Sequence, residues 1–144
     1  MSDVIIGGVI AAGAGLISGI ISGVALMIIR EGRQRKATEL GLAEELYEEV
    51  KFNRSLLADL RSEWRNMDFE TSSYQNNKGQ IGFLPTETRR ALMQAHLAAI
   101  CLNKAMAHRR EVSSTDSSFP TGELEGALQR SEDGLQAWLK SRRK

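Results

Sequence analysis

Residues 4–29 read VIIGGVIAAGAGLISGIISGVALMII, a run of 26 positions without one charged side chain. A helix of this length reaches about 39 Å, and about 20 apolar residues are enough to cross the hydrocarbon core of a bilayer. A cleaved signal peptide would have a basic start and a shorter apolar run, whereas only Met1, Ser2 and Asp3 come first here. The stretch therefore predicts one transmembrane helix within residues 1–30.

The charged residues lie almost entirely on one side of this run. All 19 Lys and Arg residues of the 144-residue chain, and all but one of its 18 Asp and Glu residues, lie from Arg30 onward. Arg30, Arg33, Arg35 and Lys36 follow the run directly, so the positive-inside rule predicts an inner-membrane protein with its amino terminus outside and residues 31–144 in the cytoplasm. That part has the size of one small domain, and its near-neutral charge argues against binding of long nucleic acids.

Small residues recur at every fourth position of the apolar run, at Gly7, Ala11, Gly15, Gly19 and Gly23. Positions four apart share a helix face, and a face of small residues lets a second helix approach closely in lipid. We expect Gly15, Gly19 and Gly23 to pack helices together in a homo-oligomer, with a tetramer favoured. The alternative is that the membrane helix merely tolerates these residues.

The remaining sequence predicts an all-α cytoplasmic domain of about three helices, at about 37–67, 85–110 and 121–140. The first has apolar residues at helical period, and no segment shows the alternation of a strand. Asn53 interrupts the apolar stripe of the first helix. We expect it to set the register of an oligomer by pairing with a partner; the alternative is a core amide that is satisfied within the chain. Residues 68–83, which are rich in Ser, Asn, Gln and Gly, predict a long loop.

No enzyme is predicted, because the sequence holds no phosphate loop, dinucleotide fingerprint, HExxH motif or nucleophile elbow. No cofactor and no metal site are predicted either. Neither histidine has a cysteine or carboxylate at metal-ligand spacing, and we interpret His96 as a core or interface residue.

Several side chains are suited to an anionic ligand. Arg89 and Arg90 lie in the first turns of the second cytoplasmic helix, where the helix dipole favours negative charge, and Lys104 lies toward its other end. The preceding loop adds a ring and polar groups that could read a nucleotide base. The six candidate ligand-binding residues are Tyr74, Asn77, Lys78, Arg89, Arg90 and Lys104. Taken singly, each can also be an ordinary surface residue, but an oligomer would repeat each one around its axis.

Two short stretches carry a resemblance, namely Glu48-Glu49-Val50-Lys51-Phe52-Asn53-Arg54-Ser55-Leu56-Leu57 and Ile100-Cys101-Leu102-Asn103. They resemble the EEI-x-x-N-x-x-LL helix and the LN helix of small single-span prokaryotic membrane proteins. The layout of the whole chain also resembles the membrane-anchored effector of type III CRISPR defence. That resemblance implies a tetrameric cytoplasmic domain that binds cyclic tetra-adenylate and disturbs the membrane, and it implies no residue roles.

Three functions remain open. The leading expectation is an antiviral-defence effector that binds a cyclic oligonucleotide messenger and perturbs or opens the bilayer through its transmembrane helices. The second is a passive membrane-anchored adaptor whose cytoplasmic helices dock a protein partner. The third is a lysis factor that damages membranes without any ligand.

Overall fold

The computed structural model describes residues 2–113, 115 and 118–143, with side chains in these ranges except those of residues 2–25, 61 and 62. The structure consists of α1 (Ser2–Glu63), η1 (Trp64–Asn66), α2 (Ser72–Asn77), η2 (Ile81–Phe83), α3 (Thr86–Glu111) and α4 (Gly122–Arg142), where η marks a 3-10 helix. The described residues include no strand, which confirms the predicted all-α class. The predicted helices at 85–110 and 121–140 begin and end within two residues of α3 and α4.

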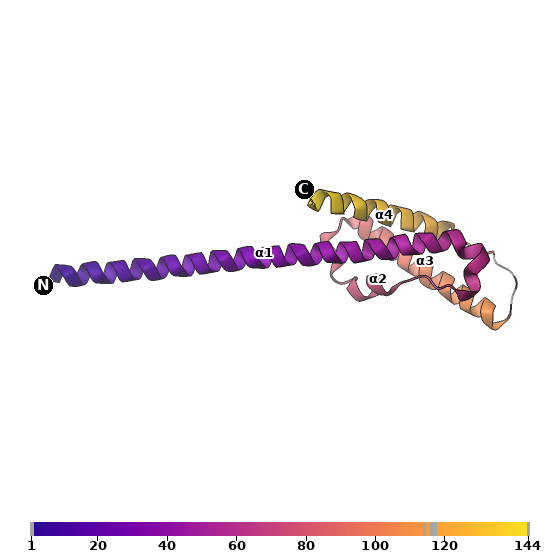
Figure 1. The fold of residues 1–144 in the computed structure, drawn as a ribbon, viewed down its shortest axis with the longest axis horizontal. Coiled ribbons are helices and arrows are strands. Elements are labelled where there is room, and N and C mark those ends of the chain that lie inside the picture. The colour runs from indigo at the N-terminus through magenta and orange to yellow at the C-terminus, as the bar shows by residue number, and fades with distance from the viewer. Residues whose placement is uncertain (1, 114, 116–117, 144) are drawn as a thin grey trace. The chain divides into compact units, whose positions relative to one another are not determined.

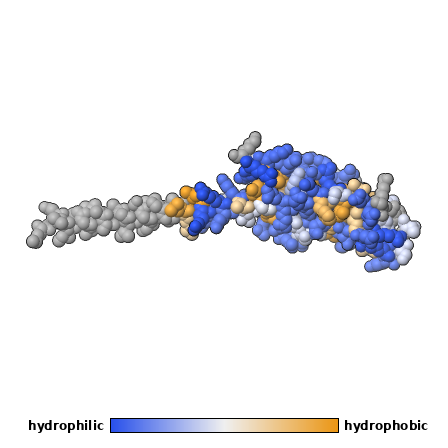
Figure 2. Space-filling view, in the orientation of Figure 1, coloured by the Kyte–Doolittle hydropathy of each residue, from blue (hydrophilic) through white to orange (hydrophobic). Residues whose placement is uncertain are grey.

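The predicted transmembrane segment, residues 4–29, lies mostly outside the described side chains, and so do Gly15, Gly19 and Gly23. The four apolar residues that end the segment, Leu26 to Ile29, are between 52% and 68% exposed and form apolar surface beside the undescribed atoms (Figure 2). Within the described part of the chain, no helix is apolar over a sufficient length to span a bilayer. The span therefore stays a prediction.

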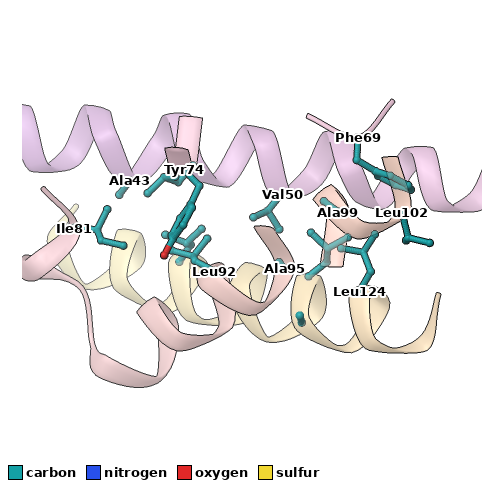
Figure 3. Packing of buried hydrophobic residues seen from close by; sticks show 14 of the residues in the cluster. Ala43, Val50, Phe69, Tyr74, Ile81, Leu92, Ala95, Ala99, Leu102 and Leu124 are labelled. Atoms are coloured by element: carbon teal, nitrogen blue, oxygen red, sulfur yellow. The ribbon is translucent and has the colours of Figure 1, made fainter. Parts of the chain in front are cut away.

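The chain divides into two compact units, Met1–Thr38 and Glu39–Lys144. We call the second one the helical unit. In it, α3 and α4 lie along residues 39–63 of α1 (Figure 1). The core of this unit comes from all of its elements, and Figure 3 shows side chains from α1, α3 and α4 meeting between the helices.

Polar contacts show the direction of each helix in the helical unit. Near the end of α3, Arg110 Nη2 donates to the carbonyl of Trp64, 3.2 Å away, so α3 runs in the same direction as α1. At the end of α4, Arg143 Nη2 lies 2.7 Å from Glu44 Oε1, so α4 runs back toward the start of the unit. A second ion pair, between Arg54 of α1 and Glu132 of α4, joins the same two helices midway.

The prediction that residues 68–83 form a loop is wrong in part, because the segment contains α2 and η2. Phe69, Tyr74, Ile81 and Leu84 are all buried and anchor the segment to the core. Their spacings of five, seven and three positions follow neither a helix nor a strand, so the sequence offered no period to read. The segment is a packed connection.

The contact between α3 and α4 depends on a glycine. A Cβ placed on Gly134 would lie 2.4 Å from Oγ1 and 2.9 Å from Cγ2 of the buried Thr88. No carbon atom approaches a neighbour so closely, so any side chain at this position would push the two helices apart.

We therefore expect Gly134→Ala to lower the free energy of unfolding by about 1–3 kcal/mol, the usual cost of overpacking. Gly126→Ala on the same helix is the matched control. Its Cβ would meet only the end of the Arg130 side chain, at 3.3 Å, and the exchange should stabilise the helix by about 0.4–1 kcal/mol. Chemical denaturation followed by circular dichroism measures both values. Equal stability of the two variants would contradict the close packing at Gly134.

Candidate functional site

Asn53 of α1 binds the backbone of the connecting segment. Its Nδ2 donates to the Glu70 carbonyl at 2.7 Å, and its Oδ1 accepts the Glu70 N–H at 2.8 Å. The side chain is 4% exposed, so both amide groups are used inside the protein. This is the satisfied core amide that the sequence left as the alternative to an oligomer-register residue. The oligomeric state itself stays a prediction.

Asn103 of α3 makes the same pair of hydrogen bonds to the backbone of Phe69, the residue before Glu70. Its Oδ1 accepts the Phe69 N–H at 2.8 Å, and its Nδ2 donates to the Phe69 carbonyl at 2.9 Å. Two helices thus hold two successive residues of the connection, each through one asparagine. We call this arrangement of Asn53, Asn103, Phe69 and Glu70 the asparagine clasp. It acts as a strand partner would, because each amide offers one donor and one acceptor.

Carboxylates hold the start of α2 beside the clasp. Glu49 of α1 accepts the Ser73 N–H at 2.7 Å and the Tyr74 N–H at 3.4 Å, and Glu70 accepts the N–H groups of Thr71 and Ser72 at 3.0 and 2.8 Å. Burial raises the pKa of Glu49, although its bonds from Ser73 and Tyr74 act in the opposite direction. Hydrogen bonds from Ser72 lower the pKa of Glu70. Negative charge is thereby placed where α2 exposes free N–H groups.

Residues of the two stretches 48–57 and 100–103 hold the connection between α1 and α3. Glu49 and Asn53 belong to the first stretch, and Asn103 belongs to the second. All three contact residues 69–74 and so hold the connection in place.

The loop residues predicted to bind a ligand are engaged within the fold. Tyr74 is buried, and its ring packs against the ring of His96 with 4.7 Å between centroids. Asn77 Nδ2 donates to the Ser73 carbonyl at 2.9 Å, and Lys78 Nζ donates to Gln75 Oε1 at 3.3 Å. The Tyr74 ring is therefore not an exposed stacking platform.

His96 is buried, as the sequence predicts, and its Nδ1 has no hydrogen-bond partner among the described residues. Burial lowers the pKa of His96, and the positive charge of Lys78 lowers it further. The neutral ring is therefore the form that suits the folded protein. Tyr74, Lys78 and His96 are brought together, but as the packed support of α2 rather than as an open site.

The three cationic candidates on α3, namely Arg89, Arg90 and Lys104, do not lie together in one site. Arg89 is half-buried and donates to Thr86 Oγ1 at 3.1 Å, whereas Arg90 is exposed and pairs with Glu87 at 3.0 Å. Lys104 lies fourteen residues beyond Arg90 on the same helix, which separates them by about 21 Å along the axis. Arg90 and Lys104 of one chain therefore lie at different levels of α3.

Arg90 lines a groove between α3 and α4 that has a volume of about 460 Å³. The residues lining it are Glu87, Thr88, Arg90, Ala91, Gln94, Arg130, Asp133 and Gly134. Arg130 Nη2 donates to Gln94 Oε1 across the groove at 3.2 Å. Sequence reasoning missed Arg130 and Gln94, because only the antiparallel packing of α4 on α3 brings them together.

The groove combines two guanidinium groups with two carboxylates and one amide. Such a set suits a ligand that carries both negative charge and hydrogen-bond donors. The described part of the chain contains no group of three or more His, Cys, Asp or Glu residues placed to hold a metal ion.

The asparagine clasp predicts a stability effect at Asn53. Asn53→Asp keeps the acceptor for the Glu70 N–H but replaces the donor to the Glu70 carbonyl with a carboxylate oxygen. We expect it to lower the free energy of unfolding by about 1–3 kcal/mol, the cost of an unsatisfied buried group. The control is Asn76→Asp at an exposed position of α2, which should stay within about 0.5 kcal/mol. Equal losses in denaturant titrations would refute the clasp.

The buried His96 predicts a pH dependence. Because its pKa is lower in the folded than in the unfolded chain, the unfolded chain binds more protons below the ordinary value of 6.5. Stability should thus be complete above pH 6.5 and fall as the pH drops toward 5, by at most about 1.4 kcal/mol per pH unit. His96→Phe keeps a ring on Tyr74 and should remove this slope. His108→Phe, at an exposed position, should retain it; identical pH profiles for both variants would contradict the prediction.

Comparison with known proteins gives no further constraint on the site. No protein-family model matches the chain, and no curated protein or solved structure matches it significantly.

Proposed function

We propose that the protein is a non-enzymatic, membrane-anchored effector whose helical unit binds a small anionic messenger, and that the messenger is a cyclic oligonucleotide such as cyclic tetra-adenylate. The groove between α3 and α4 carries this proposal. Its volume of about 460 Å³ lies in the usual range of small-molecule sites, about 300–1,000 Å³, and it contains Arg90, one of the residues singled out by the sequence.

The chemistry of the groove matches a nucleotide better than a simple anion. Arg90 and Arg130 can bind phosphate oxygens, since guanidinium groups form charge-assisted bonds with phosphates. Gln94 can pair with the edge of an adenine, which offers both a donor and an acceptor. Glu87 and Asp133 can accept hydrogen bonds from exocyclic amino groups. Inorganic phosphate would use only the two arginines, since it has no base edge for Gln94 and no exocyclic amino group for Glu87 and Asp133.

Anchoring to the inner membrane rests on the 26 uncharged residues from Val4 to Ile29 and on the basic residues that follow them. In this proposal the helical unit faces the cytoplasm, and messenger binding perturbs or opens the bilayer through the transmembrane segments of a tetramer. The resemblance to the membrane effector of type III CRISPR systems supports a role in antiviral defence.

One observation favours the second candidate, a passive adaptor. Met93 and Leu97 of α3 are large apolar side chains that are 45% and 54% exposed. Such side chains can dock a protein partner. An adaptor would bind its partner without any messenger and would leave membranes intact.

The test uses the full chain reconstituted in lipid vesicles that contain a self-quenched dye. Cyclic tetra-adenylate should bind in calorimetry and release the dye, whereas linear tetra-adenylate should do neither. Arg90→Glu and Arg130→Glu should each weaken binding by roughly ten- to a hundredfold, because each removes a charge-assisted contact and adds a repulsive charge.

The control is Lys140→Glu, which makes the same charge change at an exposed position of α4 outside the groove. It should bind as the unaltered protein does. No binding of any cyclic oligonucleotide would refute the messenger and favour the adaptor. Dye release on reconstitution, without ligand, would favour the lysis factor. Equal effects of Lys140→Glu and Arg90→Glu would show that the groove is not the site.

A further inference from the structure

Two faces of the helical unit carry exposed apolar and charged side chains, and the first lies on α3. Met93, Leu97, Cys101, Lys104 and His108 follow one another at steps of three or four residues and thus share one helix face. All five are exposed. We call this face the α3 ridge. It is apolar in its first half and basic in its second half.

The second face is a groove along α1 and η1 with a volume of about 310 Å³. Phe52, Leu56, Asp59 and Glu63 form its α1 side, again at steps of three or four residues, and Phe52 is 51% exposed. We call this face the α1 groove. Like the α3 ridge, it is apolar in its first half, but its second half is acidic.

We propose that the α3 ridge of one chain packs into the α1 groove of a second copy of the same chain. Three properties of the two faces support this occupant. Their apolar halves can cover each other, and their charged halves have opposite signs. Moreover, α1 and α3 run in the same direction within the helical unit. A second copy that is related by rotation about an axis parallel to α1 therefore presents its α1 groove with the apolar half and the charged half in the same order as on the α3 ridge.

The two faces also lie at the same level along the helical unit. Tyr74 joins His96 of α3 to Glu49 of α1, and Arg110 of α3 binds the Trp64 carbonyl. Each residue of α1 therefore lies at the same height along the helix axes as the α3 residue whose number is about 47 higher. The offset holds along both helices because they have the same rise per residue. Phe52 is then level with the stretch from Leu97 to Cys101. By the same offset, the acidic half of the groove is level with the basic half of the ridge, so rotation without translation brings the matching halves together.

This interface is heterologous, because it joins two different surfaces. A heterologous contact whose rotation closes produces a ring in which every chain uses both faces once. The inference rests on the oligomer of the proposed function and specifies its contact. It does not require the messenger, so its test is independent of ligand binding.

The test uses Cys101, the only cysteine of the chain, as a probe for the neighbour of the α3 ridge. A chain with Phe52→Cys and Cys101→Ser carries its thiol in the α1 groove instead. Each chain alone should stay monomeric on a non-reducing gel after mild oxidation in membranes. Co-expression of the two chains should give a disulfide-linked dimer, because a disulfide needs Cα atoms within about 7 Å.

The matched control carries Ala58→Cys and Cys101→Ser, with the thiol at an exposed position of α1 outside the groove. It should give no dimer with the unaltered chain. Dimers of equal yield from both pairs would overturn the interface, and so would a dimer of the unaltered chain alone, since that would place one ridge against another. Linkage of Cys101 to a different protein would overturn it in favour of an adaptor.

A charge exchange provides a second measurement. Lys104→Glu should shift the mass of the detergent-solubilised chain from oligomer to monomer, and Asp59→Lys in the same chain should restore the oligomer, because Asp59 is the acidic residue of the groove most nearly level with Lys104. Restoration identifies the pairing of the two faces, whereas a merely misfolded variant would not recover. A Lys104→Glu chain that stays oligomeric, or a double variant that stays monomeric, would contradict the proposed contact. Loss of messenger binding with the interface intact would refute only the proposed function.

Discussion

The helical unit depends on the pairing of two successive backbone units, those of Phe69 and Glu70, with the side chains of Asn53 and Asn103. The chain must return from the end of α1 to the start of α3, and it does so between these two helices. Backbone groups buried there without partners would each cost about 1–3 kcal/mol. Asparagine suits the task because its amide has the same donor and acceptor as a peptide group.

The other features of the connection follow from this pairing. With Glu70 fixed, its carboxylate lies at the start of α2, and Glu49 of α1 reaches the next N–H groups. The short helix then sets Tyr74 against His96, which closes the core at this level. A helix of six residues has little stability by itself, since isolated helices shorter than about 12–15 residues are marginal in water. Its place is determined by the side chains that hold its first turn.

The helices α3 and α4 could be predicted from the sequence because their information is local, whereas the helix expected at 37–67 is the last part of α1, which ends at Glu63 and is followed by η1. The apolar period, the proline before α3 and the polar stretch before α4 locate each element, and the burial of Leu46, Val50 and Leu60 agrees with the predicted stripe. The same reasoning failed for residues 68–83. Four irregularly spaced apolar side chains and partners on two distant helices determine that segment, and no local pattern records them.

The candidate site also combines features that local sequence predicts with features that depend on distant parts of the chain. Arg90 could be identified from its position in the first turns of a helix, whereas Arg130 becomes its neighbour only through the antiparallel packing of α4. The ring of Tyr74 is buried rather than exposed for a related reason. A tyrosine in a polar stretch suggests an exposed ring, and nothing local to it indicates that His96, more than twenty residues away, covers its face.

The two proposed surfaces on α3 lie next to each other, and this would link binding of the proposed ligand to the proposed association. The α3 side of the ligand groove extends from Glu87 to Gln94, and the α3 ridge begins at Met93. A ligand that displaces Arg130 from Gln94 would change the contacts of the turn that carries Met93. In a ring, the neighbouring α1 groove would experience that change, and α1 also contains the apolar residues 4–29. A ligand needs differential affinity for two arrangements to shift their populations, and a contact at the edge of an interface provides it. The heterologous contact would thus let each bound messenger act on the α1 helix of the next chain.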